Sequence, residues 1–118
     1  MAFSMSRIST HILDISRGQP AADVPVRLET QASPGSWRLL NAARTDRDGR
    51  CALMLPGDEL PPGLYRLVFD TASYFGKLKI EGRYPVVEIT FQVRSEESQL
   101  HMPLLLSPNG YTTYRGIG

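Results

Sequence analysis

The chain has 118 residues, and its thirteen basic and twelve acidic side chains leave a net charge of only +1. This length corresponds to one domain over residues 1–118, and the scattered, nearly balanced charges predict that nucleic acid is not a partner. The longest apolar runs are far shorter than the roughly 20 residues that cross a membrane, so we expect no membrane partner either.

Short segments separated by nine prolines and ten glycines alternate between apolar and polar residues, as strands with one buried face do. The alternation is plainest where Val24, Val26 and Leu28 point one way while Arg27 points the other. Eight strands at this spacing predict an all-β sandwich. The predicted strands cover residues 8–15, 24–31, 37–45, 50–54, 63–69, 86–93, 100–106 and 111–115.

The connections between predicted strands carry two local signals. The sequence Asp46-Arg47-Asp48-Gly49 lies between the third and fourth strands, where glycine can adopt the positive φ of a tight hairpin turn. Further along, Asp70 can cap the free backbone N–H groups of a short helix over residues 71–75, which Gly76 can end. We therefore expect one hairpin turn and one short helix at these positions.

The seventh predicted strand departs from the alternating pattern. Met102 and Leu104 share one face, but Pro103 and Leu105 lie on the other face with His101, so both faces are largely apolar. A sandwich buries only the inner face of each sheet. Another copy of the chain is the simplest cover for the outer face.

Cysteine usage and the first residues bear on the cellular setting. Cys51 is the only cysteine, which excludes an intrachain disulfide and a thiolate metal cluster within one chain, so packing is its simplest role. Residues 1–10 have one arginine and no apolar segment typical of a secretion signal. We therefore expect a reducing, cytoplasmic environment.

The candidate functional side chains are few, because the signatures of nucleotide-binding loops, zinc proteases and serine hydrolases are absent. His11, Arg50, His101 and the polar, aromatic run 111–115 remain. On spacing alone, a lone histidine is more often a core or interface residue, an arginine beside a turn is usually solvated, and a β-prone run is most simply a terminal strand. Two histidines also lack the third and fourth ligands expected of zinc, so we predict no metal.

Three segments of the chain resemble the 5-hydroxyisourate hydrolases, the transthyretin-related enzymes of urate breakdown. They are Ser9-Thr10-His11-Ile12-Leu13-Asp14, Thr45-Asp46-Arg47-Asp48-Gly49-Arg50, and the stretch from His101 that ends in Tyr114-Arg115-Gly116. The last tripeptide is the most specific mark of the resemblance, because transthyretins themselves lack it. The resemblance covers nearly the whole chain and implies a transthyretin-like, eight-stranded antiparallel β-sandwich with one short helix. It also implies a homotetramer, a dimer of dimers with its sites between subunits.

The sequence departs from the family pattern near its end. The family usually ends in Tyr-Arg-Gly-Ser, but Ile117 follows Gly116 here, so any contact made by the serine hydroxyl is missing. Many members have a further histidine at the position of Gln99, and Met102 replaces a valine. Because the histidine next to the proline is the one assigned to catalysis, Gln99 leaves the assignment of His101 intact.

The resemblance implies hydrolysis of a small-molecule substrate, 5-hydroxyisourate, to 2-oxo-4-hydroxy-4-carboxy-5-ureidoimidazoline, with no cofactor and no covalent nucleophile. It assigns His101 or His11 as the base that activates water, and the other histidine as orienter or proton donor. The ordinary histidine pKa of about 6.5 suits proton transfer at neutral pH. Arg50 would stabilise charge on oxygen and clamp the heterocycle, since a guanidinium stays charged and is a planar fork. The residues expected to shape the substrate site are Tyr111, Thr113, Tyr114 and Arg115.

Two other functions fit parts of the sequence. A transthyretin-like carrier or small-ligand binding module would share the fold and perform no chemistry. An apolar hormone channel, however, has no need of three convergent basic groups such as His11, Arg50 and His101. A structural or adhesion sandwich is what the periodicity alone would predict.

Overall fold

β-Strands make up most of the chain in the computed structural model, which describes residues 5–56 and 60–117. In chain order the elements are β1 (Met5–Asp14), β2 (Gln19–Pro20), β3 (Pro25–Ser33), β4 (Ser36–Arg44), β5 (Arg50–Pro56), β6 (Gly63–Phe69), α1 (Thr71–Lys77), β7 (Val87–Val93), β8 (Gln99–His101), β9 (Leu104–Ser107) and β10 (Gly110–Thr113). Among the described residues no helix is long and apolar enough to span a bilayer.

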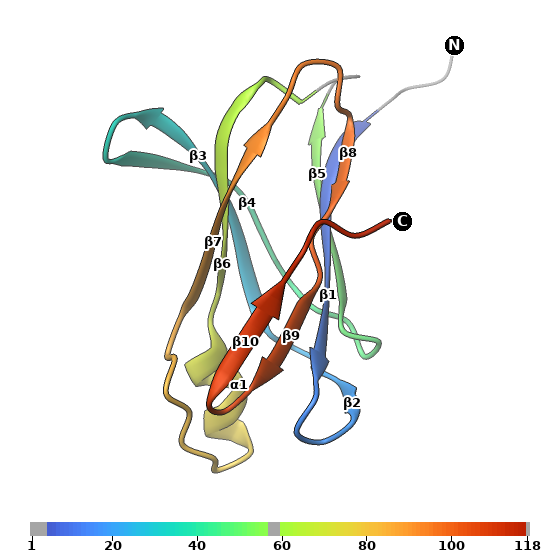
Figure 1. Cartoon of the computed structure of the whole chain (residues 1–118), viewed down its shortest axis with the longest axis vertical. Coiled ribbons are helices and arrows are strands. Elements are labelled where there is room, and N and C mark those ends of the chain that lie inside the picture. The colour runs from blue at the N-terminus through green and yellow to red at the C-terminus, as the bar shows by residue number, and fades with distance from the viewer. Residues whose placement is uncertain (1–4, 57–59, 118) are drawn as a thin grey trace.

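The strands form two sheets that face each other across one hydrophobic core (Figure 1). One sheet has the antiparallel order β4-β3-β6-β7. The other is built around β1, which pairs antiparallel with β2 and β5 and parallel with β8 and β9. β10 extends this second sheet by pairing antiparallel with β9. The predicted β-sandwich is therefore confirmed.

Alternation along β1 decides which of its side chains fill the core. Ile8 and Ile12 are fully buried, together with Leu67 from the facing sheet. Each such burial contributes about 1.5–3 kcal/mol relative to exposure, so the inner face holds the strand in place. Because successive side chains point to opposite faces, Ser9 and His11 lie on the outer face.

The predicted strand over residues 100–106 is split into two short strands, β8 and β9, at Met102 and Pro103. Pro103 has no backbone N–H to offer a neighbouring strand, so a break at this point is expected. Met102 bridges the break, since its N–H donates to the carbonyl of Ser9 (2.8 Å) and its carbonyl accepts from the hydroxyl of Thr10 (2.6 Å). Because of this split and the short β2, the described residues form ten strands in place of the eight predicted. In contrast to the antiparallel arrangement expected, β8 and β9 run parallel to β1.

The turn at residues 46–49 is not the predicted hairpin. β4 and β5 belong to different sheets, so the turn carries the chain from one layer of the sandwich to the other. Gly49 does adopt the expected positive φ, +77°. The Asp46 carboxylate accepts the N–H groups of Asp48 (2.9 Å) and Arg50 (3.0 Å). These bonds fix the backbone conformation with which β5 begins.

The short helix forms where the sequence predicts it. The Asp70 carboxylate accepts the N–H of Ser73 (3.0 Å), which confirms the predicted N-cap, but the helix continues to Lys77 instead of ending at Gly76. Its buried Tyr74 donates a hydrogen bond to Asp14 at the end of β1 (2.7 Å). Burial, together with this contact, raises the pKa of Tyr74 to about 12.

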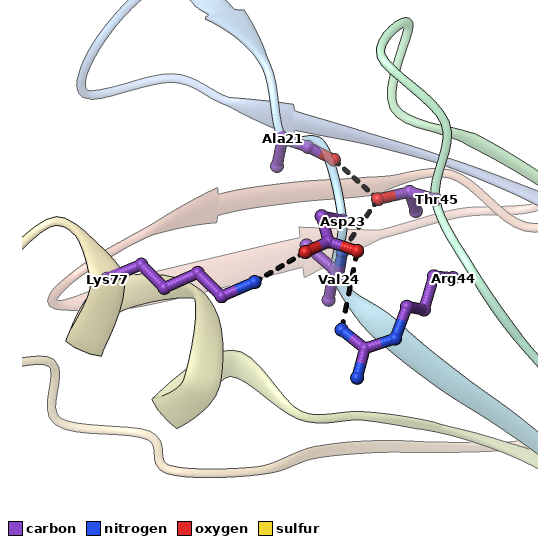
Figure 2. A network of polar contacts seen from close by, with 6 residues as sticks. All are labelled: Ala21, Asp23, Val24, Arg44, Thr45 and Lys77. Atoms are coloured by element: carbon purple, nitrogen blue, oxygen red, sulfur yellow. Dashed lines mark hydrogen bonds and ion pairs between the residues drawn. The ribbon is translucent and has the colours of Figure 1, made fainter.

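A polar network ties the link between β2 and β3 to the end of β4 and to α1 (Figure 2). The buried Thr45 hydroxyl donates to the carbonyl of Ala21 (2.8 Å) and accepts the N–H of Val24 (2.9 Å). Asp23 forms ion pairs with Lys77 and Arg44, and the hydrogen bond from Lys77 is the main cause of its lowered pKa. Because these charged groups are exposed, the threonine contributes more than the ion pairs to fixing the link.

Candidate active site

Sheet register gathers the three predicted catalytic side chains on the outer face of β1. His11 lies directly opposite Arg50 of β5, and Ser9, two residues earlier on the same face, lies beside His101 of β8. Residues far apart in the sequence are thus neighbours, because β1 is flanked by β5 on one side and β8 on the other. The site draws on the first, middle and last parts of the chain.

His101 is held from both its side chain and its backbone. Its Nδ1 lies 2.8 Å from the hydroxyl oxygen of Ser9, and its carbonyl accepts the N–H of Gly116 (2.7 Å). Partial burial is the largest cause that lowers its pKa, followed by the positive charges of His11, Arg50 and Arg7. Most His101 side chains are therefore neutral at pH 7, as a general base requires.

A surface hollow of about 240 Å³ brings together His11, Arg50, His101 and Tyr114. Pro103 and Leu105 form part of its apolar wall. The volume is below the roughly 300–1,000 Å³ of pockets that enclose drug-sized ligands, so it suits a smaller molecule. Convergent basic groups over an apolar wall can hold a polar, planar compound and act on it by proton transfer.

The C-terminal tail lies against His101 within the same chain. A Cβ at Gly116 would lie 2.9 Å from the imidazole and 2.9 Å from the ring of Pro103, so the tail backbone packs closely on both. Pro103 is buried in this way. The expectation that another copy of the chain covers the outer face therefore does not hold for Pro103, which the chain's own tail covers. Ile117 beyond it is fully exposed.

The other predicted substrate-binding residues are divided between places. Tyr114 lines the hollow with the histidines, whereas Arg115 lies at a neighbouring hollow and forms a long ion pair with Glu97 (3.8 Å). Tyr111 and Thr113 pair with inward-facing residues of β9, so they lie on the opposite side of the sheet from His11. Their contact with substrate stays a prediction, and within one chain they do not line the hollow.

Tyr111 and Thr113 have structural contacts of their own. The Tyr111 ring packs edge-on against Tyr84, with centroids 5.3 Å apart. The Thr113 hydroxyl donates to the carbonyl of Pro103 (2.8 Å). This bond supports the segment that separates β8 from β9, next to His101.

Two residues of this face were not singled out from the sequence. Ser9 contacts the imidazole of His101, and Arg7 lines two hollows beside it. Alternation was the signal that could have found them, because positions 7, 9 and 11 of one strand share a face. Their pairing with β8 could not be read from the sequence, since it depends on a parallel register.

Metal ligands do not gather at this face. Across residues 5–56 and 60–117, no three or more histidine, cysteine, aspartate or glutamate side chains are placed to hold a metal ion. Cys51 is buried, and burial, with the nearby Asp46 charge, raises the pKa of its thiol. The thiol is therefore poorly suited to act as a nucleophile or ligand at neutral pH.

Comparison with known proteins gives this geometry a context. Residues 8–116 match the model of the HIUase/Transthyretin family. The 5-hydroxyisourate hydrolase of Mus musculus is 42% identical over 98% of this chain and 99% of that protein, and that of Salmonella typhi is 40% identical over 98% and 85%. The solved Klebsiella pneumoniae 5-hydroxyisourate hydrolase aligns with TM-score 0.80 and 34% identity over 95% of this chain and all of its own. Sea bream transthyretin in complex with thyroxine aligns with TM-score 0.85 and 28% identity over 94% and 95%. The chain therefore belongs to the HIUase/Transthyretin family.

Proposed function

We propose that the chain is a hydrolase that converts 5-hydroxyisourate to 2-oxo-4-hydroxy-4-carboxy-5-ureidoimidazoline in purine breakdown. The observation that carries the proposal is the convergence of His11, Arg50 and His101 on one hollow of the β1 face. Several relatives about 40% identical over nearly the full chain bear the name 5-hydroxyisourate hydrolase. The bond to be broken is the C–N bond of a cyclic amide in a small heterocycle.

His101 is the general base of the proposed reaction. Its lowered pKa, caused first by burial, leaves the imidazole neutral at pH 7. When Nδ1 carries the proton, it donates a hydrogen bond to the Ser9 hydroxyl. The lone pair of Nε2 is then available to accept a proton from water. Ser9 thus acts as a positioning residue that orients the imidazole of the base.

Arg50 and His11 serve the remaining steps. Water attack places negative charge on the amide oxygen, and the Arg50 guanidinium supplies fixed donors to stabilise it. When the C–N bond breaks, the leaving nitrogen needs a proton, which His11 on the same hollow can give. The products are a carboxylic acid, which loses its proton at neutral pH, and a ring-opened N–H group.

We also propose that four copies of the chain assemble as a dimer of dimers, with the β1 faces meeting at the sites. The hollow is open on the surface of one chain, and the exposed Tyr114 and Ile117 beside it leave apolar surface for a second copy to cover. A cytoplasmic location stays a prediction, supported by a single buried cysteine without a disulfide partner.

The decisive experiment follows the ultraviolet decay of 5-hydroxyisourate, generated from urate by urate oxidase, with and without the protein. His101→Ala and Arg50→Ala are expected to lose at least about 100-fold in turnover, the usual scale for a general base or an oxyanion donor. Arg83→Ala is the matched control, because this exposed arginine lies between α1 and β7 and lines none of the three hollows around His101. Light scattering checks that the assembly is unchanged. Near-normal ring opening by either site variant would contradict the assigned roles.

A carrier without chemistry is the second candidate, favoured by the close structural match to a transthyretin in complex with thyroxine. Such a carrier would leave the spontaneous decay of 5-hydroxyisourate unchanged at any protein concentration. The same ultraviolet assay therefore separates the two functions.

A further inference from the structure

The outer face of β1 carries a second guanidinium that the mechanism above does not use. Arg7 is partly buried on this face, where the sheet register places it beside Gln99 of β8 and Met54 of β5. Within the part of the chain that the structure describes, neither Arg7 nor Arg50 forms an ion pair with a carboxylate. Although the charge of Arg50 helps to lower the pKa of Asp46, both guanidinium groups can bind a ligand without breaking an ion pair.

The sheet arranges these side chains in three successive rows. His101, Ser9 and Ala52 form the middle row, with Arg7 in the row on one side and Arg50 in the row on the other. Neighbouring rows are about 7 Å apart, because residues two apart in a strand are separated by two rises of about 3.3–3.4 Å. Ser9 and Ala52 are small, and above them lies a hollow of about 220 Å³ that both arginines and His101 line.

The charges around this hollow favour an anion. Arg7 and Arg50 bring two positive charges, against one negative charge from Asp46. One oxygen of Asp46 already accepts the backbone N–H groups of Asp48 and Arg50, so this carboxylate serves the turn. Burial lowers the pKa of His101, which is neutral at pH 7 and adds no third charge.

Hydrolysis of a cyclic amide creates the anion that such a hollow can hold. The oxygen of water bonds to the acyl carbon, the C–N bond breaks, the nitrogen takes one proton, and the new carboxylic acid releases another at neutral pH. The product therefore has a negatively charged carboxylate group at the carbon that was attacked, where the neutral amide had no charge. Guanidinium forks bind a carboxylate through paired, charge-assisted hydrogen bonds.

We propose that Arg7 and Arg50 form a carboxylate subsite above Ser9 and Ala52, which holds the acid group of the ring-opened product; the identity of the ligand rests on the proposed function. Arg50 contacts the reacting group throughout, whereas Arg7 engages it after the C–N bond has broken. Arg7 is thereby a product-binding residue, and its removal weakens the retention of product.

The first test uses malonate as a stable probe of the subsite and malonamide as its neutral counterpart. Backbone amide shifts of Ser9 and Ala52 are followed by NMR in the full chain during each titration. Malonate is expected to shift both amides, and Arg7→Gln to weaken its binding at least about tenfold, the loss of one charge-assisted interaction. Arg83→Gln removes one exposed positive charge elsewhere and is expected to bind malonate as the wild type does. Equal affinity of the wild type and Arg7→Gln, or equal binding of malonamide, would overturn the subsite.

The second test measures inhibition of ring opening by accumulated product, at pH 8, where His101 is neutral in every variant. Arg7→Gln is expected to raise the inhibition constant of the product at least about tenfold relative to Arg83→Gln. An unchanged constant would overturn the product-binding role. If malonate binding depends on Arg7 but the wild type opens no ring, the proposed function fails while the anion subsite stands.

Discussion

Replacing Gly49 with alanine tests whether the turn before β5 sets the position of Arg50. At Gly49, with φ of +77°, a Cβ would lie 2.4 Å from the carbonyl oxygen of Ile12, 3.2 Å from Pro20 Cβ and 3.3 Å from a backbone nitrogen. Ile12 lies near the end of β1, directly after His11. No side-chain rotation relieves a clash with a backbone carbonyl, so either the turn or β1 must move.

Gly35 is the matched control for this substitution. Its φ is also +77°, but a Cβ there would meet nothing within 4 Å. Alanine costs about 1–2 kcal/mol at either position because of the left-handed conformation. At Gly49 the overpacked contact lowers the free energy of unfolding by about 1–3 kcal/mol more, which urea denaturation measures as the difference between the two variants.

Activity gives the second readout of Gly49→Ala. The carbonyl of Gly49 accepts the N–H of Ile12 (2.8 Å), so a shift of the turn displaces Arg50 relative to His11. A displacement of about 1 Å can cost about 100-fold in rate, and we expect kcat/KM to fall by about that factor while Gly35→Ala keeps the wild-type value. Equal loss of stability and equal rates in the two variants would refute the reasoning.

Three further predictions concern the hydrogen bonds and charges around the site and its support. Ser9→Ala is expected to lower kcat about tenfold and to shift the ¹⁵N resonance of His101 Nδ1, which loses its hydrogen bond, and Ser9→Thr is expected to restore both. Because burial and nearby charges lower the pKa of His101, the acid limb of kcat/KM lies below pH 6.5, and it moves upward in Arg7→Gln, which loses one of those charges. Asp14 is buried: burial alone would raise its pKa, but hydrogen bonds from Ser16, Tyr74 and Arg17 outweigh that effect and lower it. Asp14→Asn therefore costs about 1–3 kcal/mol at pH 7, and calorimetry should show the cost shrinking as the pH falls below 3.8.

The sandwich and the three central side chains could be predicted from the sequence. Alternation marks the buried face of each strand, and the resemblance to a known family selects His11, Arg50 and His101 from a small number of candidates. Local composition also identifies the Asp70 cap and the positive φ of Gly49. These features depend on neighbouring residues, which a sequence displays directly.

The partners across the sheet could not be predicted in the same way. Whether Tyr111 lies on the face of His11 depends on the register of β10 against β9, and a shift of one residue would reverse its face. The turn at Gly49 has the composition of a hairpin, yet the chain changes sheets there because β5 pairs with β1. The contact between Ser9 and His101 joins residues 92 positions apart, which no local pattern records.

The position of β1 between strands from the middle and the end of the chain has a consequence for biosynthesis. On the ribosome, the first strand emerges long before β8 and β9, its parallel neighbours, have been translated. One edge of β1 is open during that interval, and open strand edges promote association with other chains. A chain released before residue 116 would also lack the glycine whose N–H holds the backbone of His101. Truncated chains are thus expected to be inactive, and a nascent chain gains its catalytic face only after residue 116 has been translated.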